Sequence, residues 1–396
     1  MEGDRGRGEK SSKNSIDMKM SMMDIEKVNF QELKKLRAEI HANPRVSGNE
    51  GDTAERIAKY IKPLNPKNLF TGVGGNGVIA EFAVYGLKGS NVLLRAELDA
   101  LPIGHRCGHD GHMAILCGVA QWLSEVQKES FASALDKESY RSVYLLFQPE
   151  EEIGTGAKKM VGAVDYEWVF ALHNWPGFKE NSVILFPNCY AWGSTGMKIS
   201  FKGAPSHASE PEHSAKIGEI ISNFVLAVSY LNGESAFSTC IGIKMGEENF
   251  GTAPGDGTVC LTVRGANESL LNSLVEQIKV AAEMVVAKVA EGQKVETEIS
   301  FCDEFPPTMN NSEANAIVEK VAKELNLEII TNSVGDRGSD DFCYLAAGKK
   351  SAFFNLGAGE NLPPIHSPEF EFNDNLIKTG VSLFAGVLKE IFSCKE

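Results

Sequence analysis

The chain has 396 residues, of which 43% are hydrophobic, and it carries a formal net charge of −14. This length exceeds one ordinary hydrophobic core, so two domains are expected. The negative charge argues against nucleic acid or an anionic membrane as the main partner, and no stretch approaches the roughly 20 apolar residues that span a bilayer.

The N-terminal residues, 1–23, are polar and charged and lack the apolar segment of a secretory signal. We expect a disordered tail there, and Met18, Met20, Met22 and Met23 leave the start of translation open. The eight cysteines are scattered without a short-spaced framework, which is typical of a reduced, cytoplasmic protein.

The spacing of apolar residues predicts a first region of mixed α and β structure. In chain order, we expect helices between 24 and 64, strands at 78–85 and 91–94, a helix at 112–126, and strands at 142–147 and 168–172. Several of these strands run directly into polar turns, where α/β proteins place active-site residues.

The element order then changes to strand, helix, strand, strand, helix, strand. The expected strands are 196–202, 239–245, 258–263 and 295–301, and the expected helices are 215–231 and 270–289. This order is the ferredoxin-like arrangement, and its length suits a small domain. A helix at 313–325, a strand at 351–355 and a closing helix at 375–392 follow. We therefore predict a larger mixed-sheet α/β metal-binding domain, 24–190 plus 304–396, with a ferredoxin-like domain, 191–303, inserted into it.

Metal-ligating residue types concentrate in the segment HRCGHDGH, residues 105–112. In an extended segment, Cys107 and His109 would point the same way. A thiolate and an imidazole facing one point suit zinc, manganese or cobalt. An isolated C-G-H is more often a buried cysteine beside a surface histidine. Three imidazoles, a thiol and Asp110 within eight residues favour a site instead.

Three further segments carry acidic or imidazole groups at turns. In FQPEEE, the adjacent Glu151 and Glu152 follow a strand end, where one carboxylate can hold a metal while its neighbour accepts a proton from water. The alternative is a solvated acidic loop. His173 and His366 are single histidines, each more often structural when alone. Both lie near a proline at the end of an apolar run, which fits a ligand held on a turn.

Six motifs in order resemble the metallopeptidase-like amidohydrolases that include hippurate hydrolase, N-acyl amino acid amidohydrolases and auxin-conjugate hydrolases. The motifs are LRAEIHANPRVSGNE, RAELDALPI, CGHDGHMAIL, FQPEEEIGTGAKKMV, GSDDF, and LGAGE with IHSPEF. Any one of them is weak, but six in the family's order make a chance resemblance very improbable.

The resemblance implies a site with two divalent ions of manganese, zinc or cobalt in the larger domain. Its ligands would be Cys107, His109, Glu152, His173 and His366. The general base would be Glu151. The inserted domain would act as a lid and form a homodimer, with His207 reaching the substrate, often across the dimer, and Arg264 suited to a substrate carboxylate.

The implied activity is hydrolysis of the amide bond of an N-acyl amino acid or similar small conjugate. A dipeptidase or carboxypeptidase on the same site is an alternative, and so is a non-catalytic binding protein on a decayed enzyme fold. Four features depart from the family. Glu150 stands where the family has Ala, the loop after Ile103 is reduced to Gly104, residues 251–254 replace an N-V-I-P segment, and the stretch after Pro211 is short. These departures bear on the substrate pocket and leave the metal ligands intact.

Overall fold

The computed structural model describes residues 25–393, which form two compact units. The first unit contains the described residues up to 185, residues 311–331, and the described chain from 349 onward; the second contains 186–310 and 332–348. The predicted tail and the candidate start methionines lie outside the described residues.

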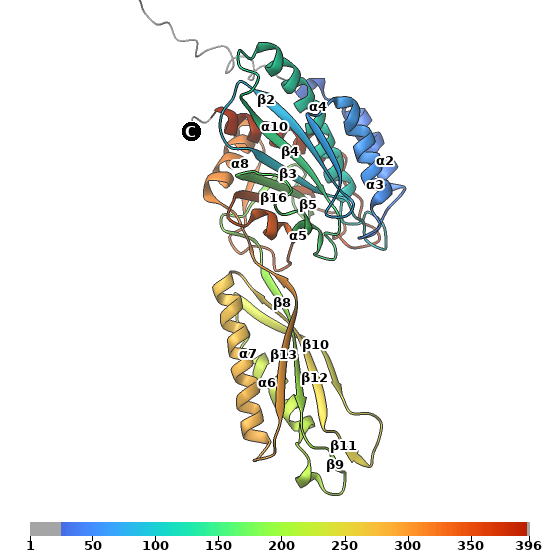
Figure 1. Ribbon diagram of the computed structural model, residues 1–396, viewed down its shortest axis with the longest axis vertical. Coiled ribbons are helices and arrows are strands. Elements are labelled where there is room, and N and C mark those ends of the chain that lie inside the picture. The colour runs from blue at the N-terminus through green and yellow to red at the C-terminus, as the bar shows by residue number, and fades with distance from the viewer. Residues whose placement is uncertain (1–24, 394–396) are drawn as a thin grey trace, which may run out of the picture. The chain divides into compact units, whose positions relative to one another are not determined.

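An eight-stranded mixed sheet forms the centre of the first unit (Figure 1). Its order is β1 (Asn68–Val73), β2 (Gly77–Tyr85), β4 (Tyr140–Gln148), β3 (Val92–Glu97), β5 (Trp168–Pro176), β16 (Lys350–Gly359), β6 (Val183–Leu185) and β15 (Ile329–Thr331). The four adjacent strands β4, β3, β5 and β16 run parallel. Their carboxyl ends therefore meet along one edge of the sheet.

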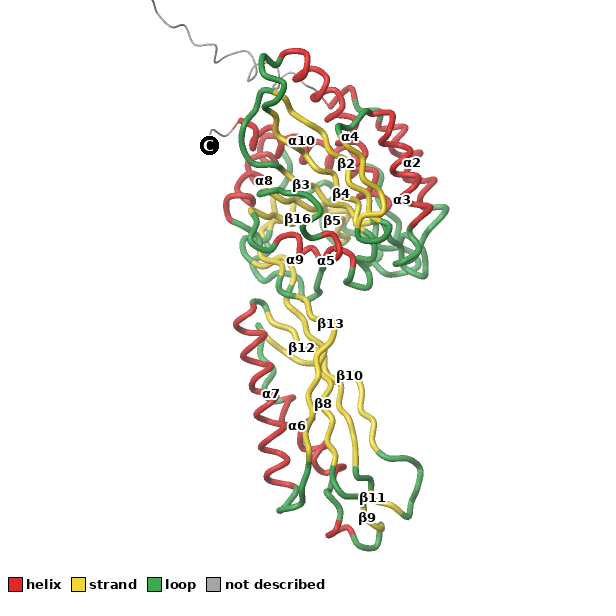
Figure 2. The backbone as a smooth tube through the Cα atoms, in the orientation of Figure 1, coloured by secondary structure: helices red, strands yellow, loops and turns green. Residues whose placement is uncertain are grey.

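Five helices bury their apolar sides in one core with this sheet (Figure 2). They are α2 (Phe30–His41), α3 (Gly51–Ile61), α4 (His109–Ser133), α8 (Ser312–Glu324) and α10 (Leu376–Ser393). Alternate residues of β2, such as Val78, Ala80 and Phe82, point into that core, as the period of two of a strand requires. In α2, Leu33, Leu36 and Ile40 are buried at helical spacing.

The second unit contains a four-stranded antiparallel sheet in the order β10 (Ala236–Met245), β12 (Asp256–Gly265), β8 (Gly193–Lys202), β13 (Glu296–Phe305). Helices α6 (Ile217–Ser229) and α7 (Glu268–Val289) pack with it around a separate core. The predicted fold class, a mixed-sheet α/β domain with a ferredoxin-like domain, is confirmed.

Several short elements were not predicted, because runs of two to six residues carry too little periodicity to be recognised. Strands β1, β6 and β15 of the first sheet are among them. The others are η1 (Ile25–Lys27), η2 (Lys62–Leu64), η3 (Pro211–His213), α5 (Gly156–Met160), α9 (Phe342–Ala346), β7 (Cys189–Ala191) paired with β14 (Thr308–Met309), and β9 (Ser206–His207) paired with β11 (Thr252–Ala253).

The predicted insertion, 191–303, falls within the second unit, which extends further at both ends and includes residues 332–348. Backbone hydrogen bonds join that segment to the unit: Trp192 N–H donates to Asp336 O at 2.9 Å, and Asp336 N–H donates to Tyr190 O at 2.7 Å. None of the described helices is long and apolar enough to cross a bilayer.

Candidate metal centre

The predicted metal ligands lie on segments at the carboxyl ends of the parallel strands. β3 leads to the segment with Cys107 and His109, β4 leads to Glu152, β5 contains His173, and the chain after β16 carries His366. Ligand sites of α/β sheets lie at this edge because polar loops converge there. All five side chains belong to the first unit.

Gly108 turns the chain between the first two predicted ligands. Its φ is +107°, and a Cβ built on it would lie 2.0 Å from Asn174 Oδ1, so only glycine fits. His109 is the first residue of α4. The prediction that Cys107 and His109 share an extended segment is therefore wrong: a left-handed glycine, rather than a strand, brings them together.

The ligand atoms form two clusters that share Cys107. In each cluster all atoms lie within 4.8 Å of one another; one is Cys107, His109 and His173, and the other is Cys107, Glu152 and His366. Cys107 Sγ lies 3.4 Å from His173 Nε2, and Glu152 Oε1 lies 3.7 Å from His366 Nε2. The mixed sulfur, nitrogen and oxygen donors suit a transition metal.

In two of the predicted histidine ligands, His109 and His173, the hydrogen bonds leave Nε2 available to bind a cation. His109 Nδ1 lies 2.9 Å from Asp99 O, and His173 Nδ1 lies 2.8 Å from Asn174 O. A carbonyl oxygen only accepts, so Nδ1 carries the proton and the lone pair of the neutral ring is on Nε2. His109 Nε2 and Glu152 Oε1 are buried without a hydrogen-bond partner among the described residues. Such atoms are costly unless a bound group satisfies them, so the donor set fits a metal.

Protonation states depend strongly on burial here. Burial, together with His112, holds the pKa of His173 well below its usual value, so its ring is neutral and able to bind a cation. Burial raises the pKa of the Cys107 thiol. Binding as a thiolate therefore requires the positive charge of a metal ion.

Glu151 and Glu152 both face His109. Their Oε2 and Oε1 atoms lie 3.6 Å and 3.8 Å, respectively, from His109 Nε2. Glu150 has a left-handed backbone, with φ of +54°, and its carboxylate pairs with Lys159 instead. Glu150 thus has a different neighbour from Glu151 and Glu152, and it belongs to none of the described ligand clusters.

A buried polar network beneath the ligands was missed in the sequence. His112 Nδ1 lies 2.7 Å from Glu97 Oε2, and its Nε2 lies 2.7 Å from Asn174 Oδ1. Asn174 Nδ2 in turn donates to Cys107 O at 3.1 Å. Burial alone would raise the pKa of Glu97, but Arg95 and His112 lower it well below its usual value. The i,i+3 spacing of His109 and His112 was the available signal.

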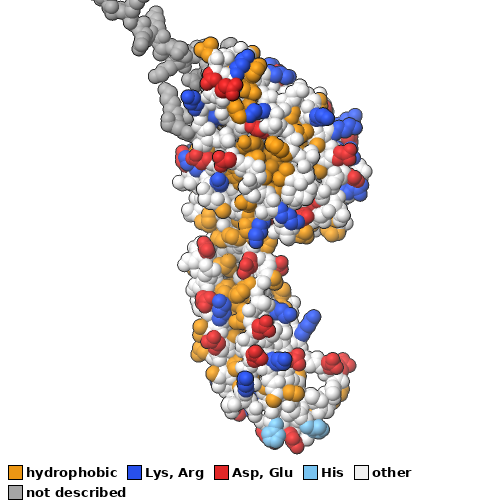
Figure 3. Space-filling view, in the orientation of Figure 1, with side chains coloured by type: hydrophobic (Ala, Val, Ile, Leu, Met, Phe, Trp, Pro, Cys, Tyr) orange, Lys and Arg blue, Asp and Glu red, His pale blue; other side chains and the backbone are white. Residues whose placement is uncertain are grey.

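The two remaining predicted site residues belong to the second unit. His207 is exposed, its Nδ1 lies 2.7 Å from Ser209 Oγ, and it pairs with Thr252. Histidine side chains are visible at the end of this unit that carries β9 and β11 (Figure 3). Arg264 donates to Arg337 O at 2.8 Å and Ser339 Oγ at 3.1 Å, and burial lowers its pKa.

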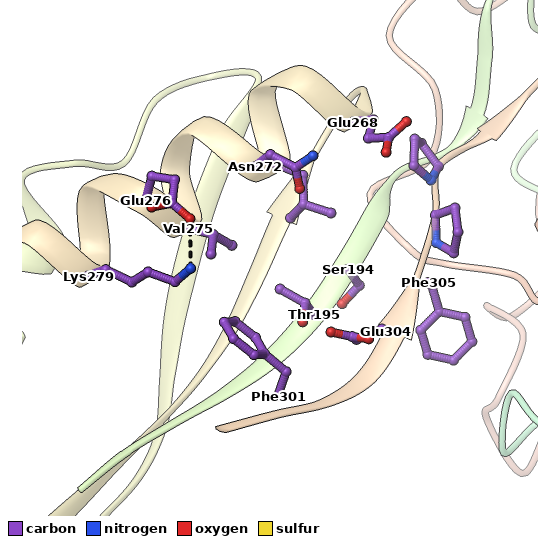
Figure 4. Close-up of a pocket in the computed structure, with 13 residues that line it drawn as sticks. Ser194, Thr195, Glu268, Asn272, Val275, Glu276, Lys279, Phe301, Glu304 and Phe305 are labelled. Carbon is purple, nitrogen blue, oxygen red and sulfur yellow. Dashed lines mark hydrogen bonds and ion pairs between the residues drawn. The ribbon is translucent and has the colours of Figure 1, made fainter. Parts of the chain in front are cut away.

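A groove of about 400 Å³ lies along α7 and β13 in the second unit (Figure 4). Its lining includes Thr195, Phe301 and Glu304, and Lys279 Nζ lies 2.7 Å from Glu276 Oε1 at its side. No histidine or cysteine lines it, so it does not offer the donor set of the metal centre.

Residues 93–390 match the family described as Peptidase family M20/M25/M40. The chain belongs to this family. M20 enzymes are metal-dependent hydrolases of C–N bonds, so the enzyme prediction is confirmed, and the alternative of a non-catalytic binding protein is set aside. Dinuclear metal binding is typical of the M20 family.

Two curated relatives of this M20 chain cover most of its length. Hippurate hydrolase of Campylobacter jejuni is 27% identical over 89% of this chain and 95% of its own. IAA-amino acid hydrolase ILR1-like 5 of Arabidopsis thaliana is 28% identical over 89% of this chain and 85% of its own.

Solved structures share the M20 fold. A putative aminohydrolase from methicillin-resistant Staphylococcus aureus has a TM-score of 0.83 and 23% identity, covering 94% of this chain and 99% of that one. The Bacillus subtilis YXEP protein, described as a dinuclear metal binding peptidase from the M20 family, has a TM-score of 0.80 and 19% identity, covering 92% and 99%. At these identities the likeness shows the fold alone.

Proposed function

We propose that this M20 enzyme hydrolyses the amide bond between an acyl group and an amino acid. The observation that carries the proposal is the pair of relatives above, which match over nearly the whole chain and are named for hippurate and for IAA-amino acid conjugates. Both names denote an acyl group joined to an amino acid by an amide. The acyl group and the amine are chosen by pocket walls that sequence similarity does not define.

In this proposal, two divalent cations of manganese, zinc or cobalt bind the two ligand clusters that share Cys107. When bound, they supply Lewis acidity, which activates a water molecule and polarises the amide carbonyl. Glu151 accepts a proton from the attacking water and delivers it to the leaving amine. Its neighbour Glu152 is a metal ligand in this proposal, because its Oε1 lies within 3.8 Å of His109 Nε2 and 3.7 Å of His366 Nε2.

Two residues of the second unit serve the substrate in this proposal. His207 donates a hydrogen bond to the oxyanion that develops on the amide carbonyl. Arg264 pairs with the substrate carboxylate, because a guanidinium binds a carboxylate through two parallel hydrogen bonds. Its present acceptors, a backbone carbonyl and the Ser339 hydroxyl, are neutral, so a carboxylate is the stronger partner.

The second unit also forms the homodimer that we propose, through the edge strand β10. The exposed apolar side chains Ile241, Ile243 and Met245 lie on it, and its outer backbone groups are available for pairing. The other edge strand, β13, carries Glu296 and Glu298. Pairing two copies of β13 would gather like charges, which is destabilising. The proposed location of this dimer is the cytoplasm.

A dipeptidase or carboxypeptidase is the second candidate function, because the same metal chemistry cleaves a peptide bond. Turnover of the two kinds of substrate distinguishes this candidate from the proposed amidohydrolase. Metal-stripped enzyme is resupplied with manganese, zinc or cobalt and given N-acetyl and N-benzoyl amino acids beside dipeptides of the same C-terminal residue. Higher kcat/KM on the acyl amino acids supports the proposal; higher kcat/KM on the dipeptides rejects it in favour of the second candidate.

A further inference from the structure

Asp110, the residue after His109, is a fully buried carboxylate at the start of α4. Arg37 Nη1 lies 2.9 Å from its Oδ2, and His41 Nδ1 lies 2.8 Å from the same oxygen. Both partners come from α2. A buried carboxylate with two cationic partners is held firmly, so the first turn of α4, which presents His109, is tied to α2.

The second ring nitrogen of His41 reaches another segment. Its Nε2 lies 3.2 Å from Glu371 Oε2. An imidazole that pairs with both carboxylates as a cation must carry both protons. The hydrogen bond to Asp110, opposed by burial, raises the pKa of His41, in accord with this state. One side chain therefore joins the first turn of α4 to the chain segment that follows His366.

Arg106 closes the connection on the other side. Its guanidinium pairs with Glu371 and donates to Phe370 O at 2.8 Å. Its own backbone carbonyl accepts the N–H of His366 at 2.8 Å. The segment 366–371 is thus attached at both ends to Arg106, the neighbour of Cys107.

His366 needs such attachment more than the other ligands do. Its side chain is 51% exposed, whereas those of His109 and Glu152 are 1% and 11% exposed. It has a left-handed φ of +66°, which strains a residue with a Cβ, and it lies between β16 and α10 where no helix or strand forms. Core packing therefore does not place its imidazole.

We propose that His41 is a positioning residue for the metal centre: by bridging Asp110 and Glu371, it holds the segment carrying His366 in register with His109. The proposal rests on the ligand set of the proposed function. Its effect is to reduce the conformational entropy that His366 loses when a cation binds. Removing the bridge lowers the affinity for the cation that needs His366. The other cation, on Cys107, His109 and His173, keeps its ligands.

The test is titration of metal-stripped protein with Zn²⁺ or Mn²⁺ by calorimetry, with no substrate present. The parent chain should bind two ions, and His366→Ala defines which binding step depends on that ligand. Glu371→Gln removes the negative charge that faces His41 Nε2. In His41→Asn, the amide can replace Nδ1 at Asp110 but is too short to replace Nε2 at Glu371. Both variants should weaken the His366-dependent step by roughly tenfold, the lower end for residues that orient ligands, and leave the other step unchanged.

Glu369→Gln is the matched control, because it removes the same charge from an exposed position on the same segment. Thermal melting in EDTA should place all these variants within a few degrees of the parent, which separates positioning from folding. Unchanged binding in Glu371→Gln and His41→Asn overturns the inference, and so does an equal loss in Glu369→Gln. A parent chain that binds no second ion contradicts the ligand set itself, and thus the proposed function rather than the positioning role alone.

Discussion

Glu150 forms an ion pair with Lys159, and the same carboxylate accepts a hydrogen bond from the Thr155 hydroxyl. The next two glutamates face His109 instead. A left-handed backbone at Glu150 separates their directions. The place where this chain has Glu rather than the expected Ala is thereby occupied by a structural ion pair.

This arrangement predicts three different results from three neighbouring substitutions. Glu151→Gln should retain both metals and lose turnover by about 10²–10⁴, the usual contribution of a general base. Glu152→Gln should lower the metal content. Glu150→Gln should leave both the turnover and the metal content close to those of the parent chain. Elemental analysis and kcat on the same preparations check this, and metal loss in Glu151→Gln with full occupancy in Glu152→Gln would exchange the two roles.

For His207, loss of an oxyanion donor should reduce kcat by about 10²–10³ in His207→Ala, with metal content unchanged. Mixed dimers of His207→Ala and Glu151→Gln subunits test whether the histidine acts across the dimer. Partial return of activity is expected, because one of the two sites then combines an intact Glu151 with an intact His207. Verified mixed dimers without recovery would restrict His207 to its own chain or remove it from the reaction.

The β10 interface predicts that Ile243→Lys yields a monomer, since a charge in the centre of an apolar edge opposes association. Phe301→Lys is the matched control on the other edge strand, where the native side chain is similarly exposed, at 42% against 51%. Light scattering at micromolar concentration should show a dimer for the parent and for Phe301→Lys. If the Ile243→Lys variant were still a dimer, the interface would have to lie elsewhere.

His105 predicts a pH dependence of stability. It is 1% exposed, and neither ring nitrogen has a hydrogen-bond partner among the described residues. Burial lowers its pKa from 6.5 to about 4. Between these values the unfolded chain binds the extra proton, so stability falls as pH falls from about 6.5 to 4, by up to about 3 kcal/mol.

In His105→Leu, the free energy of unfolding should no longer show this fall between pH 6.5 and 4. The substitution should cost little stability near pH 7, because it replaces an unpartnered polar ring with an apolar group. Urea unfolding in EDTA at several pH values measures this. His213→Gln, an exposed histidine, is the control and should keep the parental slope. An unaltered slope in His105→Leu would show that His105 is already neutral in the unfolded chain or protonated in the folded one.

Local sequence pattern was sufficient to predict the elements with strong periodicity and the residues that can bind metal. The order of helices and strands around residues 193–305 predicted the ferredoxin-like sheet, because each element there is long enough to show its period of 2 or 3.6. Motif order predicted the family, and with it Cys107, His109, Glu152, His173 and His366, whose donor atoms cluster in the structure.

How those residues meet, and which side chains support them, depends on the folded arrangement of distant segments. Gly108 is the N-cap of α4, at a place where an extended segment was expected. The clash that any Cβ at this position would make with Asn174, 66 residues away, cannot be seen in the local sequence pattern. The same holds for the bonds of Glu97 to His112 and of His41 to Asp110 and Glu371. Periodicity reports which face of an element is buried, whereas these partners are selected by contacts between segments distant in the chain.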